Sequence, residues 1–130
     1  MTVRRRAAAG LLAAAAVGVA ADAPAAPDGE QLYTRCMACH ALAYDRVGPR
    51  HCGLFGRRAG SLPGFAYTPA MRSSGIVWNA ATLDRFLAAP MKVVPGTSMT
   101  YDGIADAAER AALIAWLERA GRSAECARPK

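Results

Sequence analysis

Cysteine and histidine side chains are grouped in the segment Cys36-Met37-Ala38-Cys39-His40. The spacing Cys-x-x-Cys-His is typical of the attachment site of a c-type haem, because two thiols three residues apart can add to the two vinyl groups of one porphyrin. The histidine that follows would then lie under the iron as an axial ligand. The segment therefore predicts one covalent haem c, with Cys36 and Cys39 as anchors and His40 as a metal ligand.

Two other kinds of site also use a Cys-x-x-Cys pair, namely redox dithiols and zinc sites. A thioredoxin-like dithiol would need a βαβ pattern around it, and a structural zinc site would need a second pair of cysteines or histidines at matching spacing. The sequence contains neither pattern. Haem attachment is therefore the favoured interpretation of the segment.

A second axial ligand to the iron would have to come from elsewhere in the chain. The candidates are His51, Met37, Met71, Met91 and Met99. Met37 lies inside the attachment loop, and Met71 and Met91 lie on or beside expected helices, where a thioether more often packs in the core or on the surface. Met99 ends the turn-rich segment 95–99, and a loop of that kind can present a sulfur to the metal. Met99 is the preferred candidate, and His51 is expected to be a packed or partly exposed loop residue.

The first 21 residues have the pattern of a secretory signal peptide. Arginines at positions 4–6 precede an uncharged, alanine-rich run over residues 7–21, and small residues at 19–21 suit cleavage. The run is shorter than the roughly 20 residues that span a bilayer, although an uncleaved anchor is the alternative. The sequence thus predicts export to the periplasm without stable membrane insertion, and residues 22–27 are expected to remain as a flexible tail.

Charge and size narrow the possible functions. The formal net charge of the 130-residue chain is +6, and three of the positive charges belong to the expected signal peptide. The remaining basic residues are scattered along the chain, which argues against nucleic-acid binding. A domain this small buries a limited share of its surface, and only three Phe, four Tyr and two Trp are available for its core. We expect a monomeric single domain whose core is completed by the porphyrin.

Helix-capping side chains mark the expected helix starts, which are Asp28 with Gln31, Asn79, and Asp106 with Glu109. The first helix should run through residues 32–33 into the attachment segment, the second should span residues 80–89, and the third should end at Gly121. No run resembles a strand. The pattern predicts an all-α domain over residues 28–121 with about three main helices, followed by a C-terminal tail over residues 122–130.

Glycine and proline are frequent between residues 41 and 75, which predicts an ordered loop with one helical turn over residues 69–73. A loop of this length is uncommon inside a compact domain unless it carries out a function. Wrapped around a haem, it could pack against the porphyrin instead of another helix. The long loop is therefore consistent with the cofactor.

Six segments along the chain together have the order and spacing of a known family. They are 36–40 (CMACH), 48–49 (GP), 53–57 (GLFGR), 63–67 (PGFAY), 75–78 (GIVW) and 95–99 (PGTSM). On these segments, residues 28–121 resemble the class I c-type cytochromes, the branch that includes mitochondrial cytochrome c and its small bacterial relatives. The resemblance implies a class I cytochrome c fold, with long loops wrapped around one haem.

The resemblance also implies how the iron would be held. His40 and Met99 would be the axial ligands, a pair that raises the reduction potential because the soft thioether favours ferrous iron. The backbone carbonyl of Pro49 would accept a hydrogen bond from the His40 ring. Phe86 stands where many relatives have a tyrosine whose hydroxyl approaches the axial sulfur, and Met71 stands where relatives often have an asparagine. With Phe86 the hydrogen bond to the axial sulfur should be missing, and Met71 suggests a drier distal side of the haem.

Three further residues acquire roles from the resemblance. Tyr67 and Trp78 would hydrogen-bond the haem propionates, and Arg57 would compensate the propionate charge nearby. Ordinary core packing is the alternative for the two aromatic side chains.

Two contacts between distant parts of the chain are expected as well. The resemblance implies that residues 32–33 of the first helix cross Leu113 and Trp116 of the last. It also implies that the loop with Cys52 lies near the end of the last helix, close to Cys126. Spare thiols tend to pair in an oxidising compartment, so a Cys52–Cys126 disulfide is predicted, and two unpaired thiols are the alternative.

Two classes of function are compatible with such a site. Iron with both axial positions filled by protein exchanges only electrons, whereas a haem peroxidase or gas-binding sensor needs a labile methionine ligand. Met99 favours an electron carrier that is not an enzyme. Its expected partners are redox proteins, namely a membrane cytochrome complex, an oxidase or a periplasmic dehydrogenase. Arg35, Arg46 and Lys92 would surround the haem edge and meet them, with weak electrostatic steering.

Overall fold

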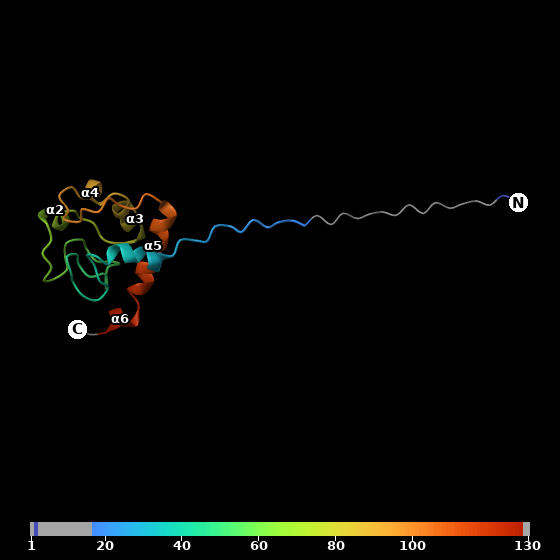
Figure 1. Ribbon diagram of the computed structural model, residues 1–130. Coiled ribbons are helices and arrows are strands. Elements are labelled where there is room, and N and C mark those ends of the chain that lie inside the picture. Colours follow the sequence, from blue (N-terminus) through green and yellow to red (C-terminus); the bar gives the residue numbers. More distant parts are fainter. Residues whose placement is uncertain (1, 3–16, 129–130) are drawn as a thin grey trace.

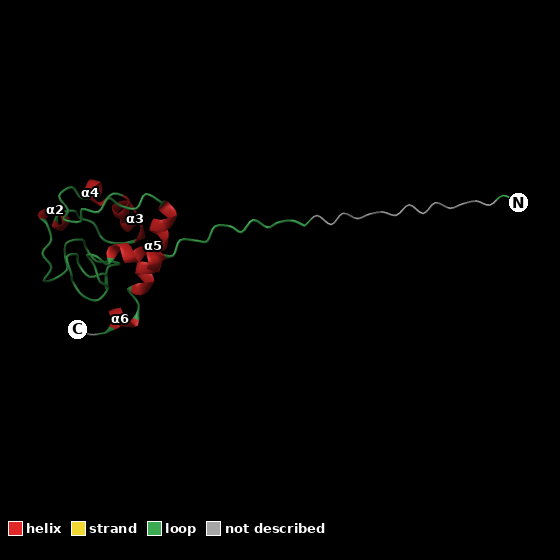
Figure 2. Ribbon diagram, in the orientation of Figure 1, coloured by secondary structure: helices red, strands yellow, loops and turns green. Residues whose placement is uncertain are grey.

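Short helices joined by long loops make up the structure, a computed structural model that describes residue 2 and residues 17–128. Within these residues no strand forms (Figure 2). One isolated antiparallel bridge joins Arg58 and Val77. The helices are α1 (Gly29–Tyr33), the 3-10 helix η1 (Thr34–Cys36), α2 (Pro69–Arg72), α3 (Ala80–Ala88), α4 (Pro90–Val93), α5 (Ala107–Ala120) and α6 (Ala124–Ala127). The prediction of an all-α domain is confirmed.

The segment that precedes α1 lies apart from the helices. Residues 17–28 are exposed and extended, and they lead away from the folded part of the chain (Figure 1). Most of the predicted signal peptide falls on residues 1 and 3–16, which lie outside the described residues. None of the described helices is both long enough and apolar enough to cross a membrane.

Aspartate caps fix the starts of α1 and α5. Asp28 Oδ1 accepts a hydrogen bond of 3.0 Å from the amide of Glu30, and Asp106 Oδ1 accepts one of 2.8 Å from the amide of Glu109. Each cap satisfies an amide that has no partner within its own helix. Both helices therefore begin where the sequence predicts, although Asp28 caps Glu30 rather than the expected Gln31.

A complete capping box begins α3. Asn79 Oδ1 accepts from the amide of Thr82 at 2.9 Å, and Thr82 Oγ1 accepts from the amide of Asn79 at 2.8 Å. The helix ends at Ala88, one residue before the predicted end. Pro90 ends α3 as expected, but it also begins α4, because the fixed backbone angle of proline suits the first turn of a helix.

The core is built where α1 crosses α5 (Figure 1). Gly29 allows the close approach, since a Cβ at this position would overlap the carbonyl oxygen of Ala112 and lie 2.6 Å from Cβ of Trp116. Further along α1, the Tyr33 ring packs on Trp116 with centroids 4.5 Å apart. Leu113 lies beneath, fully buried, and burial of such a side chain stabilises the fold by about 1.5–3 kcal/mol. The predicted crossing of the first and last helices is confirmed.

The long loop is tied to the segment before α3 by backbone hydrogen bonds. The amide of Gly56 donates to the carbonyl of Trp78 at 2.8 Å, and the amide of Trp78 donates to the carbonyl of Arg57 at 2.9 Å. Ala59 donates in the same way to Ile76 at 2.8 Å. These bonds bring Arg57 and Trp78 together although 20 residues separate them in the sequence.

The C-terminal residues are also attached to the loop. Residues 124–127, within the predicted tail, form α6, and Cys126 on this helix lies with its sulfur 2.00 Å from that of Cys52. The two cysteines stand 74 positions apart, so a bridge between them would join the end of the chain to the loop beside residue 51. Closing a loop of that length in the unfolded chain accounts for roughly 4 kcal/mol in chain-entropy models.

Replacement of Gly29 by alanine should destabilise the helix crossing. The added Cβ has no room against α5, so the free energy of unfolding is expected to fall by about 1–3 kcal/mol. Denaturation by guanidinium chloride, followed by circular dichroism, measures the change. Gly121→Ala is the matched control, because its Cβ would meet nothing nearer than 3.4 Å, and its unfolding free energy should change by less than about 1 kcal/mol. Equal stabilities of the two variants would contradict the proposed close approach.

Candidate functional site

A cavity of about 500 Å³ lies between η1 with the attachment segment, the long loop, α3, the segment that follows α4, and α5. All the residues that the sequence predicts for haem and metal binding line it: Cys36, Cys39, His40, Pro49, Arg57, Tyr67, Trp78 and Met99. The cavity also receives His51 and Met71, whereas Met37 and Met91 do not line it and are 51% and 43% exposed. Cys52 and Cys126 lie outside its lining.

The His40 ring is held with one nitrogen bonded and the other available. Its Nδ1 lies 2.8 Å from the carbonyl oxygen of Pro49, and because a carbonyl can only accept, Nδ1 carries the proton and donates it. The lone pair of Nε2 is then directed away from this contact and is available to a metal. Burial lowers the pKa of His40, and the Pro49 carbonyl partly offsets that shift. His40 is therefore neutral near pH 7, as a metal ligand must be.

Gly48 is required at its position because the backbone passes against the His40 ring. A Cβ on Gly48 would overlap Cε1 of His40 and lie 2.6 Å from both ring nitrogens. The amide of Gly48 also donates to the carbonyl of Cys39 at 2.7 Å, which ties this segment back to the attachment loop. Absence of a side chain at Gly48 thus lets Pro49 reach the histidine.

A second imidazole lies against the first, which the sequence did not predict. The rings of His40 and His51 are stacked, with centroids 4.3 Å apart and planes inclined by 22°. Nδ1 of His51 lies 3.1 Å from the hydroxyl oxygen of Tyr33 on α1. Burial, followed by the proximity of His40 and Arg57, lowers the pKa of His51 to about 3. Burial likewise raises the pKa of Tyr33 to about 12, so both groups are uncharged at neutral pH.

Met99 lies on a loop that is held by hydrogen bonds between residues close in the sequence. Its amide donates to Oγ1 of Thr97 at 3.2 Å, and the amide of Thr97 donates to the carbonyl of Val94 at 3.0 Å. The neighbouring cavity wall contains Phe86 on α3, which meets the ring of Trp78 edge-on with centroids 5.0 Å apart. Apolar side chains of α3 and the thioether of Met71 continue this wall.

A different part of the cavity wall contains Arg57, Tyr67 and Trp78. Arg57 donates to the carbonyl oxygens of Arg50 at 2.9 Å and Cys52 at 3.2 Å, so its guanidinium is held by the loop. Burial lowers the pKa of Arg57 and raises the pKa of Tyr67. One held cation and two polar-tipped aromatic side chains therefore meet at this end of the cavity.

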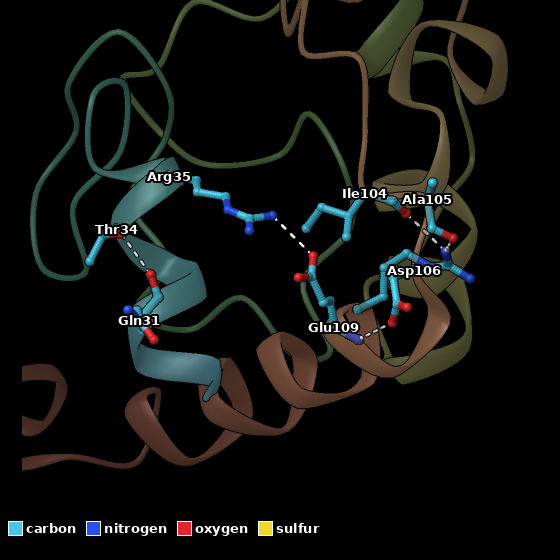
Figure 3. A network of polar contacts seen from close by, with 8 residues as sticks. Gln31, Thr34, Arg35, Ile104, Ala105, Asp106 and Glu109 are labelled. Atoms are coloured by element: carbon cyan, nitrogen blue, oxygen red, sulfur yellow. Dashed lines mark hydrogen bonds and ion pairs between the residues drawn. The ribbon is translucent and has the colours of Figure 1, made fainter. Parts of the chain in front are cut away.

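A polar network joins α5 to the helix before the attachment segment (Figure 3). Arg35 on η1 forms an ion pair of 3.0 Å with Glu109 in the first turn of α5. Arg110 donates to the carbonyl oxygens of Ile104 and Ala105, both at 2.9 Å, and pairs with Asp84 of α3 at 2.7 Å. The network fixes the end of the segment that carries Met99 relative to α3 and α5.

The basic residues expected around the haem edge are not equally free. The Arg35 guanidinium is engaged by Glu109, which raises its pKa, and Arg46 donates to the carbonyl oxygen of Met37. Lys92 on α4 is exposed and takes part in none of the ion pairs among the described residues. Of the three cations expected around the haem edge, Arg35 and Arg46 therefore have intramolecular partners, and their placement at that edge stays a prediction.

The residues around the cavity fit a covalently attached haem. The volume of the cavity lies within the range of about 300–1,000 Å³ that is usual for cofactor sites. Both thiols of the attachment segment, Cys36 and Cys39, are unpaired. A neutral imidazole and a thioether, the donor types that bind haem iron in c-type cytochromes, face the same cavity as these thiols.

Comparison with known proteins agrees with this site. The family model "Cytochrome c" matches residues 26–120. Cytochrome c2 of Rhodomicrobium vannielii is 44% identical over 109 residues, covering 79% of this chain and 87% of that protein. Cytochrome c of Gibberella zeae is 43% identical over 88 residues, covering 65% and 83%. The solved structure of cytochrome cH from Methylobacterium extorquens matches with a TM-score of 0.68 and 39% identity, covering 70% of this chain and 94% of that one.

The chain belongs to the cytochrome c family, and its fold is that of the class I cytochromes c. Proteins of this family carry one covalently attached haem c and transfer electrons rather than catalyse a reaction. The protein is accordingly an electron carrier with a c-type haem.

Replacement of Gly48 by alanine should displace the His40 ring. The Cβ would occupy space that the imidazole now fills, so ligation should weaken and a smaller fraction of the purified protein should carry a low-spin haem. Absorption spectra of the ferric protein, normalised to protein concentration, measure this fraction. Gly121→Ala is the control and should give the wild-type spectrum, because its Cβ would meet nothing nearer than 3.4 Å and Gly121 does not line the cavity. A wild-type spectrum for Gly48→Ala would refute the steric argument.

Proposed function

We propose that this chain is a periplasmic one-electron carrier whose haem iron is bound by His40 and Met99. The observation that carries the proposal is the hydrogen bond of 2.8 Å from His40 Nδ1 to Pro49, which leaves Nε2 available in a cavity that Met99 also lines. When bound, the haem supplies an iron that alternates between the ferric and ferrous states. The protein's own part is to hold that group, exclude water and set the potential.

The other cavity residues have complementary roles in this proposal. Cys36 and Cys39 would form the thioether bonds to the porphyrin, so that the cofactor cannot dissociate. Tyr67 and Trp78 would donate hydrogen bonds to the propionates, and Arg57, already fixed by two carbonyl oxygens, would compensate their charge. These roles are supported by the fact that all five residues line the same cavity.

Met99 is preferred over Met71 as the second ligand on the basis of its backbone. Met99 lies in a loop whose amide hydrogen bonds end at Thr97 and Val94, and such a loop can direct its side chain inward. Met71 lies within α2, where its amide is bonded to the cap residue Thr68. Both thioethers pack against the core and line the cavity, so the preference rests on the backbone alone. A His/Met pair leaves no vacant axial position, which suits electron exchange and excludes substrate binding at the iron.

The location and partners follow from the charge pattern and the leader-like first 21 residues. We expect redox partners in the periplasm or at the membrane surface, such as a membrane cytochrome complex, an oxidase or a dehydrogenase. Of the three basic residues expected around the haem edge, Lys92 is the one without an intramolecular partner among the described residues, since Arg35 is paired with Glu109 and Arg46 donates to Met37. One exposed lysine supports weak steering, in keeping with brief encounters and fast turnover.

Replacement of Met99 by alanine tests the second ligand. The ferric protein should lose the weak far-red band of methionine-bound iron, the ferrous protein should bind carbon monoxide readily, and the midpoint potential should fall because the soft ligand is lost. Met71→Ala and Met91→Ala are matched controls that should keep all three properties. If Met71→Ala lost the band and Met99→Ala retained it, the assignment of the two methionines would have to be reversed.

Charge reversal at Lys92 tests the direction of electrostatic steering. With ferricyanide as an anionic oxidant, Lys92→Glu should slow the second-order oxidation rate several-fold at low ionic strength, and added salt should remove the difference. Arg122→Glu is the control and should change the rate less. Arg122 follows α5 and is paired with Glu118 of that helix. A rate for Lys92→Glu equal to that of the control at low salt would remove α4 from the docking face.

A further inference from the structure

We propose that His51 is a positioning residue for the axial ligand His40, and that Tyr33 acts on the haem iron through His51. This inference rests on the ligation of iron by His40 proposed above. It adds a relay of two contacts, from Tyr33 on α1 to His51 and from His51 to His40, and a third set of contacts that holds the backbone of His51.

The first contact is the stack of two imidazoles. The His51 ring lies on the His40 ring with centroids 4.3 Å apart and an inclination of only 22°. The Pro49 hydrogen bond restrains one atom of His40, Nδ1, and by itself leaves the ring free to tilt about that bond. A flat ring packed against the imidazole face opposes that tilt. His51 therefore supplies the restraint that Pro49 does not.

The second contact fixes the rotation of the His51 ring itself. Nδ1 of His51 lies 3.1 Å from the Tyr33 hydroxyl oxygen. This is the one hydrogen bond that the hydroxyl makes among the described residues, so donation from Tyr33 to Nδ1 satisfies both groups. The Tyr33 ring is in turn held by Trp116 at 4.5 Å on α5. The hydroxyl thus presents the His51 ring to His40 in one orientation.

The third set of contacts immobilises the backbone under His51. Its amide donates to the carbonyl oxygens of Ala41 and Leu42, both at 3.1 Å, and its carbonyl accepts from Leu54 at 3.0 Å. The next residue, Cys52, lies with its sulfur 2.00 Å from that of Cys126. With the backbone fixed at this position, the side-chain torsions are the remaining freedom of His51, and Tyr33 removes it.

The consequence concerns the electronic structure of the haem. Contacts behind a metal ligand orient that ligand and tune the metal. With haem bound, the plane of the imidazole ligand would contribute to how the unpaired electron of ferric iron is distributed over the porphyrin, and the nuclear magnetic resonance shifts of the haem methyl groups would report that distribution. A change at Tyr33 should therefore be detected at the haem although Tyr33 is not a ligand.

The experiment compares four variants of the full holoprotein with the wild type. Tyr33→Phe removes one oxygen and keeps the ring on Trp116, and Tyr44→Phe, at a residue 58% exposed on the surface, is the matched control. His51→Leu removes both the stack and the hydrogen bond, and the double variant Tyr33→Phe/His51→Leu tests whether Tyr33 acts through His51. The readouts are the haem methyl shifts of the ferric protein, the midpoint potential and the thermal unfolding midpoint.

Tyr33→Phe should displace or double the haem methyl resonances and move the potential beyond the spread seen with Tyr44→Phe. His51→Leu should cause a larger change of both, and the double variant should match His51→Leu, because the effect of Tyr33 requires His51. If Tyr33→Phe and His51→Leu lowered only the unfolding midpoint and left the shifts and potential at the control values, the positioning role would be refuted.

The spectrum of the wild type separates this inference from the proposed ligation. A ferric wild-type protein without the low-spin spectrum of a histidine-ligated haem would overturn the assignment of His40, and the relay with it. A normal wild-type spectrum with additive effects in the double variant would overturn only the relay through His51.

Discussion

The hydrogen bond from His40 to the carbonyl of Pro49 is the contact on which the site depends. It selects the tautomer with the proton on Nδ1, and so makes Nε2 the atom that a metal can bind. The contact requires the backbone of residues 48–49 to lie against the imidazole, and this requires a glycine at position 48. The long loop has little regular structure of its own, and its role here is to bring the carbonyl of Pro49 to Nδ1 of His40.

The helices supply the rigid frame that the loops lack. The crossing of α1 and α5 fixes the attachment segment, because η1 continues α1 directly into Cys36. Arg110 then binds the carbonyls of Ile104 and Ala105, and so places the end of the methionine loop against the same helix α5. An exposed ion pair such as Arg35–Glu109 contributes little stability in water, and its main effect is to define geometry. One helix thus positions both sides of the cavity.

Local features of the site could be predicted from the sequence because neighbouring residues determine them. The caps at Asp28, Asn79 and Asp106 and the attachment segment each use residues within a few positions of one another. The stack of His51 on His40 joins residues from separate turns of the loop, and no periodicity or motif in the sequence predicts such a contact. Likewise, the pairing of Arg35 with Glu109 across 74 positions requires the helix crossing to exist first.

The start of α4 shows a different limit of sequence reasoning. Pro90 was expected to end a helix, since proline cannot donate to the preceding turn. The missing N–H is harmless at the first position of a helix, where no bond to a preceding turn is needed. Pro90 therefore ends α3 and begins α4. The sequence pattern alone does not distinguish a helix that ends from two helices that meet at a corner.

The two candidate ligands are held by different kinds of force. His40 is restrained by directional contacts, a hydrogen bond to Pro49 and a stacked ring at 4.3 Å that is itself hydrogen-bonded to Tyr33. Burial of a polar ring costs free energy unless the ring is hydrogen-bonded. The two imidazoles therefore gain a defined orientation, but their desolvation opposes folding. The lining on the Met99 side contains Phe86 and aliphatic side chains together with the hydroxyl side chains of Thr97, Ser98 and Thr100, and among the described residues no hydrogen bond reaches the Met99 sulfur. The orientation of the imidazole is thus set by directional contacts, whereas the Met99 side chain is placed by packing and by the backbone of its loop.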